Sequence, residues 1–360
     1  MNCRPVPAGR WVIVCAIAFA LFSVFVLALE FALAYRGIDT TVADTVDRWL
    51  TQRARANRLG SQALALVGAS RIQLGVDLSE LDALTGMKAV QLAIDGSSFV
   101  PVLRNLAEDE GFTGSVIVSY NPEVLINPRD ADAASDYVSE WTKSGESMAA
   151  ELPVTYSVVE RRLETWLHSS LRSYADDGGP MVAIEKRILG KTPTRQYLTT
   201  LPSRERSADY QLVSIPEVYQ MRVLETMGID YKNYDLDAPP DEVEARLAAL
   251  VDNLTASGSQ QFAGELEGVE RMARQIEDRG GRVYFFVFPT SGLIRKIEER
   301  RFPRAQYWDE FAARAPEVRQ HSDGVPDMQN LSCPDGSHLD YRDKQRFTSA
   351  LAKTLGLVRQ

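Results

Sequence analysis

The sequence predicts a three-layer α/β/α protein with a parallel sheet, preceded by one membrane-spanning helix. Short apolar runs bounded by Gly, Asp or Pro alternate with segments of helical periodicity along most of the chain. That alternation is typical of a parallel sheet covered by helices on both faces. The membrane helix is predicted by one long apolar segment near the N-terminus.

The composition is that of a globular chain and has no basic surplus to neutralise the phosphates of a nucleic acid. The 360 residues are 45% hydrophobic and 25% charged, enough for one large or two small cores. The net charge is -9, and no Lys/Arg cluster interleaved with aromatic residues occurs. We therefore expect no nucleic acid among its partners.

The apolar segment is long enough to span a bilayer. Residues Trp11 to Leu29 are apolar except for Ser23, and the run resumes after Glu30 as far as Tyr35. A bilayer core takes about 20 helical residues, whereas a buried core helix, the alternative, uses about 10 to 14. The run also exceeds the apolar region of a cleaved signal peptide, so 11–35 is interpreted as a retained signal anchor.

The charges around this segment predict its orientation. Arg4 and Arg10 precede it, which places a tail of residues 1–10 in the cytoplasm and the rest of the chain outside; Arg36 opposes this orientation. Of the three cysteines, only Cys333 follows the segment. No intramolecular disulfide or zinc-type cysteine spacing is therefore predicted, and Cys333 is interpreted as a small buried residue.

Between the anchor and the sheet, helical spacing predicts a juxtamembrane helix or linker over 36–60. Its apolar residues are Val42, Val46, Trp49 and Leu50. The domain is then expected over 61–360. Strands are predicted at 63–67, 89–94, 115–119 and 282–288, with helices at 98–110, 260–279 and 340–355 and a possible late edge strand at 318–320.

Residues 123–260 do not fit a simple strand-to-strand connection and are interpreted as a large, mostly helical insertion. Helical patterns at 132–150 and 156–174 are followed by a Gly-, Pro- and Arg-rich segment to about 210. An insertion that emerges at the carboxyl ends of the strands would roof an α/β site. A helical appendage that only packs on the sheet is the alternative.

Ser70 follows the first predicted strand, in Gly68-Ala69-Ser70-Arg71. A glycine two residues earlier permits a tight turn, so the serine can point into a cleft, although a serine there also serves as a turn or cap residue. Arg71 can bind an anionic substrate group or pair with a carboxylate at the start of the next helix, and we favour the pairing.

Serine needs a base to become a nucleophile, and His338 has the most suitable position for one. Of the three histidines, His168 lies on a helical pattern and His321 follows the possible edge strand. His338 lies three residues after Asp335, in a loop before the last helix, where a turn can fold the carboxylate against the imidazole. The alternative is that Asp335 and Ser337 are turn and capping residues of that helix.

Together these residues resemble the SGNH/GDSL hydrolase superfamily, which has a flavodoxin-like sheet. The resemblance rests on a serine after the first strand and Asp-x-x-His before the terminal helix, and it covers about 60 to 355. It implies a triad of Ser70, Asp335 and His338. It also implies an oxyanion hole. Its donors would be the main-chain N–H of Ser70, Gly96 after the second strand and Asn121 after the third. Two motifs are loosened, because Gly-Asp-Ser reads Gly-Ala-Ser and Gly-x-Asn-Asp reads Ser-Tyr-Asn-Pro.

Loosened motifs of this kind are similar to the membrane-anchored branch that modifies cell-envelope glycans, including alginate and peptidoglycan acetylation proteins and the teichoic-acid D-alanylation accessory protein. The resemblance implies an acyltransferase or esterase on a bacterial inner membrane, with an extracytoplasmic domain and an acyl-serine intermediate. No metal or organic cofactor is expected. The expected partners are a glycan, an acyl donor and a multi-pass membrane acyltransferase. A non-catalytic glycan-binding or scaffold domain is the alternative.

Overall fold

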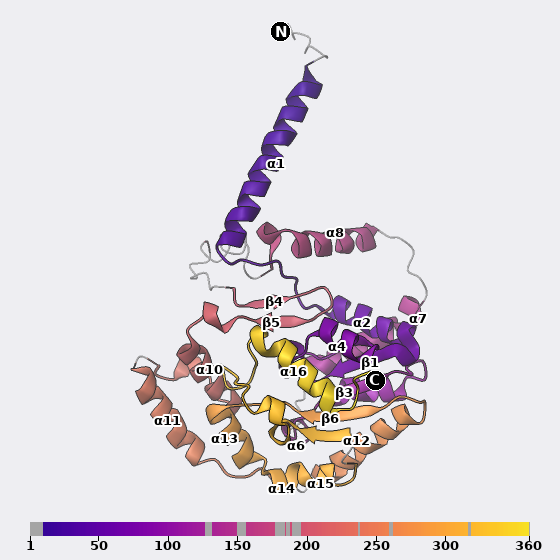
Figure 1. Cartoon of the computed structure of the whole chain (residues 1–360), viewed down its shortest axis with the longest axis vertical. Helices are drawn as coiled ribbons and strands as arrows, with labels where there is room; N and C mark the ends of the chain where they lie inside the picture. The colour runs from indigo at the N-terminus through magenta and orange to yellow at the C-terminus, as the bar shows by residue number, and fades with distance from the viewer. Residues whose placement is uncertain are drawn as a thin grey trace. The chain divides into compact units, whose positions relative to one another are not determined.

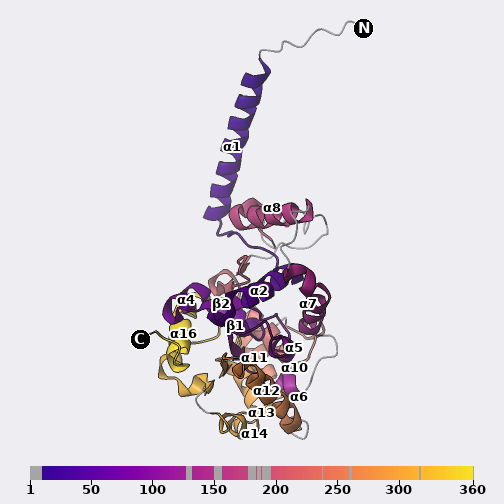
Figure 2. The ribbon, with the colours of Figure 1, turned by 90° about the vertical axis from the view of Figure 1, so that its right-hand side faces the viewer.

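The chain forms two compact units in the computed structural model, which describes residues 10–126, 132–149, 156–176, 184, 188, 196–236, 238–258, 262–315 and 318–359. One unit comprises 1–43 and 154–199, and the other comprises 44–153 and 200–360. Figures 1 and 2 show the chain in two views. The larger unit contains the sheet.

The predicted α/β fold is confirmed. A five-stranded, all-parallel sheet has the order β2-β1-β3-β6-β7, the doubly wound order of flavodoxin-like folds. Its strands are β1 (Ala63–Val67), β2 (Lys88–Gln91), β3 (Ser115–Ser119), β6 (Val283–Val287) and β7 (Arg319–His321). The predicted second strand ends early at Gln91, yet Leu92 and Ile94 still donate backbone hydrogen bonds to Leu66 and Gly68.

Helices cover both faces because side chains alternate along each strand. In β1, Ala65 and Val67 face one hydrophobic core, and Leu64 and Leu66 face the other. The first core is covered by α2 (Val46–Leu59), α5 (Val100–Glu108), α7 (Ala133–Ala149) and α12 (Phe262–Glu277). The second is covered by α3 (Ser70–Gly75), α4 (Leu78–Thr85) and α16 (Tyr341–Thr354).

The helix predicted as a juxtamembrane connection, α2, packs on the sheet. Trp49 is fully buried in the first core, and its indole N–H donates to the Leu92 carbonyl at 2.9 Å. Burying an aromatic side chain of this size removes a large apolar area from water and so fixes the helix in place. The sheet-containing unit accordingly begins at Asp44.

The segment interpreted as one insertion divides among three places. The helices α6 (Glu123–Ile126) and α7 join the first core. The helix α8 (Tyr156–Ser170) belongs to the smaller unit. After the short strands β4 (Leu198–Thr200) and β5 (Arg206–Ala208), the helices α10 (Ile215–Met227) and α11 (Pro240–Asp252) pack on α13 (Gly292–Arg301) around a third apolar cluster.

Short elements complete the described chain. They are α14 (Arg304–Tyr307), α15 (Asp309–Ala312) and the 3-10 turns η1 (Gly60–Gln62), η2 (Arg172–Tyr174), η3 (Tyr210–Leu212), η4 (Tyr231–Asn233), η6 (Ser322–Gly324) and η7 (Pro326–Met328). The buried Trp308 and Phe311, at the junction of α14 and α15 and within α15, add to the first core. These two side chains attach the segment between α13 and β7 to the first core.

The smaller unit contains α1 (Trp11–Tyr35), a 25-residue helix whose most apolar 18-residue window has a mean hydropathy of 3.0, and most of its apolar side chains are exposed. By length and composition it can cross a membrane, as an anchor or as a signal sequence. Its last turns contact η2 of the same unit.

Candidate active site

The structure brings Ser70, His338 and Asp335 into one hydrogen-bonded chain. Ser70 is the first residue of α3, three residues after β1 ends at Val67. Its Oγ lies 2.7 Å from His338 Nε2, and His338 Nδ1 lies 2.7 Å from Asp335 Oδ2. With the proton on Nδ1, the ring donates to Asp335, and Nε2 can accept the serine proton.

The loop before α16 holds the carboxylate in place. Asp335 Oδ1 accepts backbone hydrogen bonds from Ser337 at 2.9 Å and from His338 at 2.7 Å, so the acid does form the expected turn. The N-cap of α16 is Asp340, whose side chain accepts from the Arg342 N–H. The Asp335 turn therefore serves the histidine, and the helix has its own cap.

The electrostatics favour a neutral base beside an ionised acid. His338 is only 4% exposed, and burial lowers its pKa below the usual value of 6.5 despite the opposing effect of Asp335. Burial alone would raise the Asp335 pKa. Hydrogen bonds and charge from His338, together with the backbone of Ser337, instead hold that pKa well below its usual range. A neutral imidazole is therefore available to take a proton near neutral pH.

Gly68 provides the backbone conformation that the turn between β1 and Ser70 requires. Its φ is +151°, and a Cβ there would lie 2.6 Å from the Ser119 Cβ at the end of β3. No real side chain tolerates that approach, so the chain can turn toward Ser70 only with glycine at this position.

Gly96 and Asn121, the predicted oxyanion donors, both line the same cavity as Ser70 and His338. Gly96 has φ +66° at the third position of a turn closed by the Ser97 N–H and the Ile94 carbonyl, where a positive φ favours glycine. The Asn121 Oδ1 accepts from the Glu123 N–H at 3.0 Å. That bond turns the amide so that Nδ2 is the group left to donate.

Arg71 lies in an ion pair. Its Nη2 is 2.5 Å from Glu298 Oε1, and its Nε donates to Ser337 Oγ at 3.1 Å. The favoured pairing role therefore agrees with its contacts, but the carboxylate comes from α13 and not from the helix that follows the serine. Arg71 thereby fixes the side chain of Ser337, the residue next to His338.

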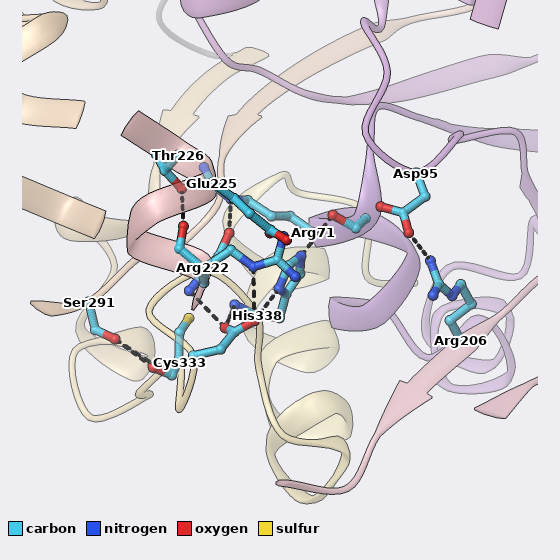
Figure 3. A network of polar contacts seen from close by, with 12 residues as sticks. Arg71, Asp95, Arg206, Arg222, Glu225, Thr226, Ser291, Cys333 and His338 are labelled. Carbon is cyan, nitrogen blue, oxygen red and sulfur yellow. Dashed lines mark hydrogen bonds and ion pairs between the residues drawn. The ribbon is translucent and has the colours of Figure 1, made fainter. Parts of the chain in front are cut away.

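A polar cavity of about 590 Å³ opens over the serine, and the insertion forms part of its wall. Residues 225–228 at the end of α10 line it, together with Arg222. The Arg222 Nε lies 3.5 Å from Asp335 Oδ2, and Arg222 also pairs with Glu225 (Figure 3). Sequence reasoning missed Arg222, because nothing in its local pattern distinguishes it from the other arginines of the insertion.

Further contacts fix both sides of the site. Ser291 Oγ donates to the Cys333 carbonyl at 2.7 Å, which ties the Asp335 loop to the start of α13 (Figure 3). Arg206 of β5 pairs with Asp95 at 2.7 Å, next to the Gly96 turn. Cys333 is buried as predicted.

The remaining histidines lie elsewhere in the chain. His168 belongs to α8, and His321 ends β7, where its Nδ1 accepts from the Asp323 N–H. Among the described residues, no group of three or more His, Cys, Asp or Glu side chains could hold a metal ion.

No family model matches the chain, and no curated protein matches it. A functional assignment consequently rests on the residues of the site and their geometry.

Proposed function

We propose that this chain is an SGNH-type serine acyltransferase or esterase that acts on a cell-envelope polysaccharide outside a bacterial inner membrane. The observation that carries the proposal is the continuous pair of 2.7 Å contacts from Ser70 through His338 to Asp335. The parallel sheet order and the placement of Gly96 and Asn121 in the same cavity support it. Assignment to the SGNH group is an inference from the order of these residues along the chain.

The proposed reaction uses each of these contacts. Ser70 Oγ attacks an acyl carbonyl carbon while its proton passes to His338 Nε2, and Asp335 stabilises the imidazolium that forms. The backbone N–H groups of Ser70 and Gly96 and the Asn121 amide stabilise the oxyanion. The leaving group takes the proton from His338 as the tetrahedral intermediate collapses. A sugar hydroxyl or water then attacks the acyl-serine, gives its proton to His338, and the proton returns to Ser70 as the acyl group leaves.

The surroundings of the serine suit a hydroxyl-rich acceptor. Carboxylates of Glu123, Asp132 and Glu225 and the guanidinium of Arg222 line the cavity, which offers donors and acceptors for sugar hydroxyls. The apolar α1 supports the proposed anchor, and Arg4 and Arg10 before it support an extracytoplasmic domain. Acyl donors are cytoplasmic, so a multi-pass membrane acyltransferase is the proposed source of the acyl group.

Trapping the acyl-enzyme tests this proposal. Full-length protein in detergent is mixed with p-nitrophenyl acetate and digested, and the acetylated peptide is identified by mass spectrometry. We expect one acetyl group on Ser70, which an added envelope glycan removes faster than water if the protein is a transferase. Acetylation of neither Ser70 nor the glycan, combined with retention on a glycan column, would support the scaffold alternative.

Arg222 provides a test through pH. Its charge beside Asp335 contributes to the lowered pKa of His338. Because the base must be neutral, the rate of Ser70 acylation should fall as the pH drops through the His338 pKa, which lies below 6.5. Replacing Arg222 by Gln removes the cation, so this pKa should rise and the acid limb should move to higher pH. Acylation rates measured from pH 4 to 8 give the result.

The matched control for this experiment is Arg222→Lys, which keeps the charge and should leave the acid limb close to its original position. An unchanged limb in Arg222→Gln, with full activity above neutral pH, would mean that the arginine has no effect on the base.

A further inference from the structure

The helix α8 presents large apolar side chains to solvent. Leu163 is 54% exposed and Trp166 is 57% exposed, and the half-buried Leu167 lies beside them. At spacings of three and four residues they share one face of the helix, whereas Thr165 and His168 lie on the opposite face. A tryptophan-containing face of this kind is typical of a helix that lies in a membrane interface.

The apolar run of α1 places Glu30 at the edge of a bilayer. The nineteen residues from Trp11 to Leu29 extend about 28 Å as a helix, close to the roughly 30 Å thickness of a hydrocarbon core. Glu30 is the first charged residue after that run. If α1 crosses a membrane, its Glu30 carboxylate lies at the level of the headgroups.

Glu30 binds the segment that follows α8. Its carboxylate accepts hydrogen bonds from the Arg172 N–H at 2.7 Å, from the Ser173 N–H at 3.0 Å and from Ser173 Oγ at 2.6 Å. These residues begin η2, two residues after α8 ends at Ser170. The contacts therefore hold one end of α8 at the depth of Glu30.

Other contacts in the smaller unit hold the same arrangement. The Asp176 N–H donates to the Thr41 carbonyl, and the Gln196 side chain exchanges two hydrogen bonds with the Asp39 backbone. In both views α8 starts beside the C-terminal end of α1 and extends sideways from it, transverse to α1 (Figures 1 and 2). A helix that runs transverse to a spanning helix, at the depth where the span ends, lies along the membrane surface.

Aromatic residues gather at this level. Tyr35, at the end of α1, is 87% exposed, and Tyr174 of η2 is 49% exposed. Tyrosine and tryptophan are enriched at the boundary between lipid and water, because their rings are apolar and their tips are polar. Trp166 of α8 adds a third such side chain.

From these contacts we propose that α8 is an interfacial helix whose face of Leu163, Trp166 and Leu167 inserts into the lipid bilayer beside α1. The inference rests on α1 crossing the membrane, but it does not depend on the chemistry of Ser70. Burial of apolar side chains drives the insertion, so it should occur on zwitterionic as well as anionic lipids and should resist salt.

Depth-dependent quenching tests the proposal. The full chain, with Cys3 and Cys15 replaced by Ser, receives one new cysteine for an environment-sensitive dye; Cys333 is buried and its thiol pKa is raised by burial. The protein is reconstituted in vesicles of phosphatidylcholine. A dye at Leu163→Cys should be quenched by lipid-attached spin labels and protected from aqueous iodide. A dye at Glu164→Cys, which is exposed beside this face, should be quenched by iodide.

A dye at Phe19→Cys, within α1, reports whether that helix has inserted. Lipid quenching at Phe19→Cys together with iodide quenching at Leu163→Cys would overturn the proposal and assign the apolar face to a protein partner. Iodide quenching of a dye at Trp166→Cys as well would show that the result at Leu163→Cys is not caused by that single substitution. Iodide quenching at Phe19→Cys would show that α1 does not cross the membrane. The proposal would then be overturned at its premise.

Discussion

Replacing Ser70 or His338 by Ala should reduce ester hydrolysis on the order of 10⁶-fold, because each residue is required for the same proton transfer. Asp335→Asn should cost about 10⁴-fold, since the amide no longer holds the His338 tautomer that accepts from Ser70. Turnover of p-nitrophenyl acetate by the full-length variants measures all three losses.

A double variant shows whether Ser70 and His338 act as one catalytic unit. The Ser70→Ala/His338→Ala double variant should be no slower than either single variant, because members of one catalytic unit are not additive. His321→Ala is the matched control, because this histidine ends β7 and does not line the cavity of Ser70, and we expect it to retain most of the activity. Independent, multiplying losses would argue that Ser70 and His338 do not act together.

Arg204→Met should lower the free energy of unfolding by about 3–5 kcal/mol, the cost of leaving a partly buried carboxylate without its partner. Arg204 is fully buried, pairs with both Asp44 oxygens at 2.6 and 2.9 Å, and donates to the Gln91 carbonyl at 3.0 Å. It therefore joins the insertion to the start of α2 and the end of β2. Urea unfolding in detergent, followed by near-UV circular dichroism, measures the change.

Two further variants separate this effect from a general loss of charge. Lys88→Ala breaks a pair in which the lysine is half exposed, and it should cost less than about 1 kcal/mol. Combining Arg204→Met with Asp44→Leu should recover part of the loss, because no unpaired carboxylate remains. A loss in Arg204→Met no larger than that in Lys88→Ala would mean that the buried pair with Asp44 contributes no more than an exposed one.

Local patterns in the sequence were sufficient for the sheet. The runs at 63–67 and 115–119 coincide with β1 and β3, because a strand buried on both faces is apolar on both sides along most of its length. The Asp-x-x-His spacing was equally informative, since a three-residue turn can satisfy both the backbone and the imidazole. No local pattern shows that Ser70 and His338 lie close together in space. That proximity could be predicted only from the expected topology of the fold.

Contacts between distant segments were not predictable from such patterns. Arg222 reaches Asp335, and Arg71 finds Glu298 on α13, because the tertiary fold brings these side chains together. The same reason explains why 123–260 looked like one insertion: amphipathic periodicity shows that a helix has an apolar face, but it does not show which surface that face covers. The helices α7, α8 and α10 lie in three different environments.

The most direct test of an activated Ser70 is labelling of the full-length protein with a fluorophosphonate, followed by mass spectrometry of the modified peptide. We expect one phosphonyl group on Ser70, absent from Ser70→Ala and strongly reduced in His338→Ala. A wild-type protein that stays unlabelled while its triad geometry is intact in solution, or that carries the label on another residue, would contradict the proposed serine chemistry.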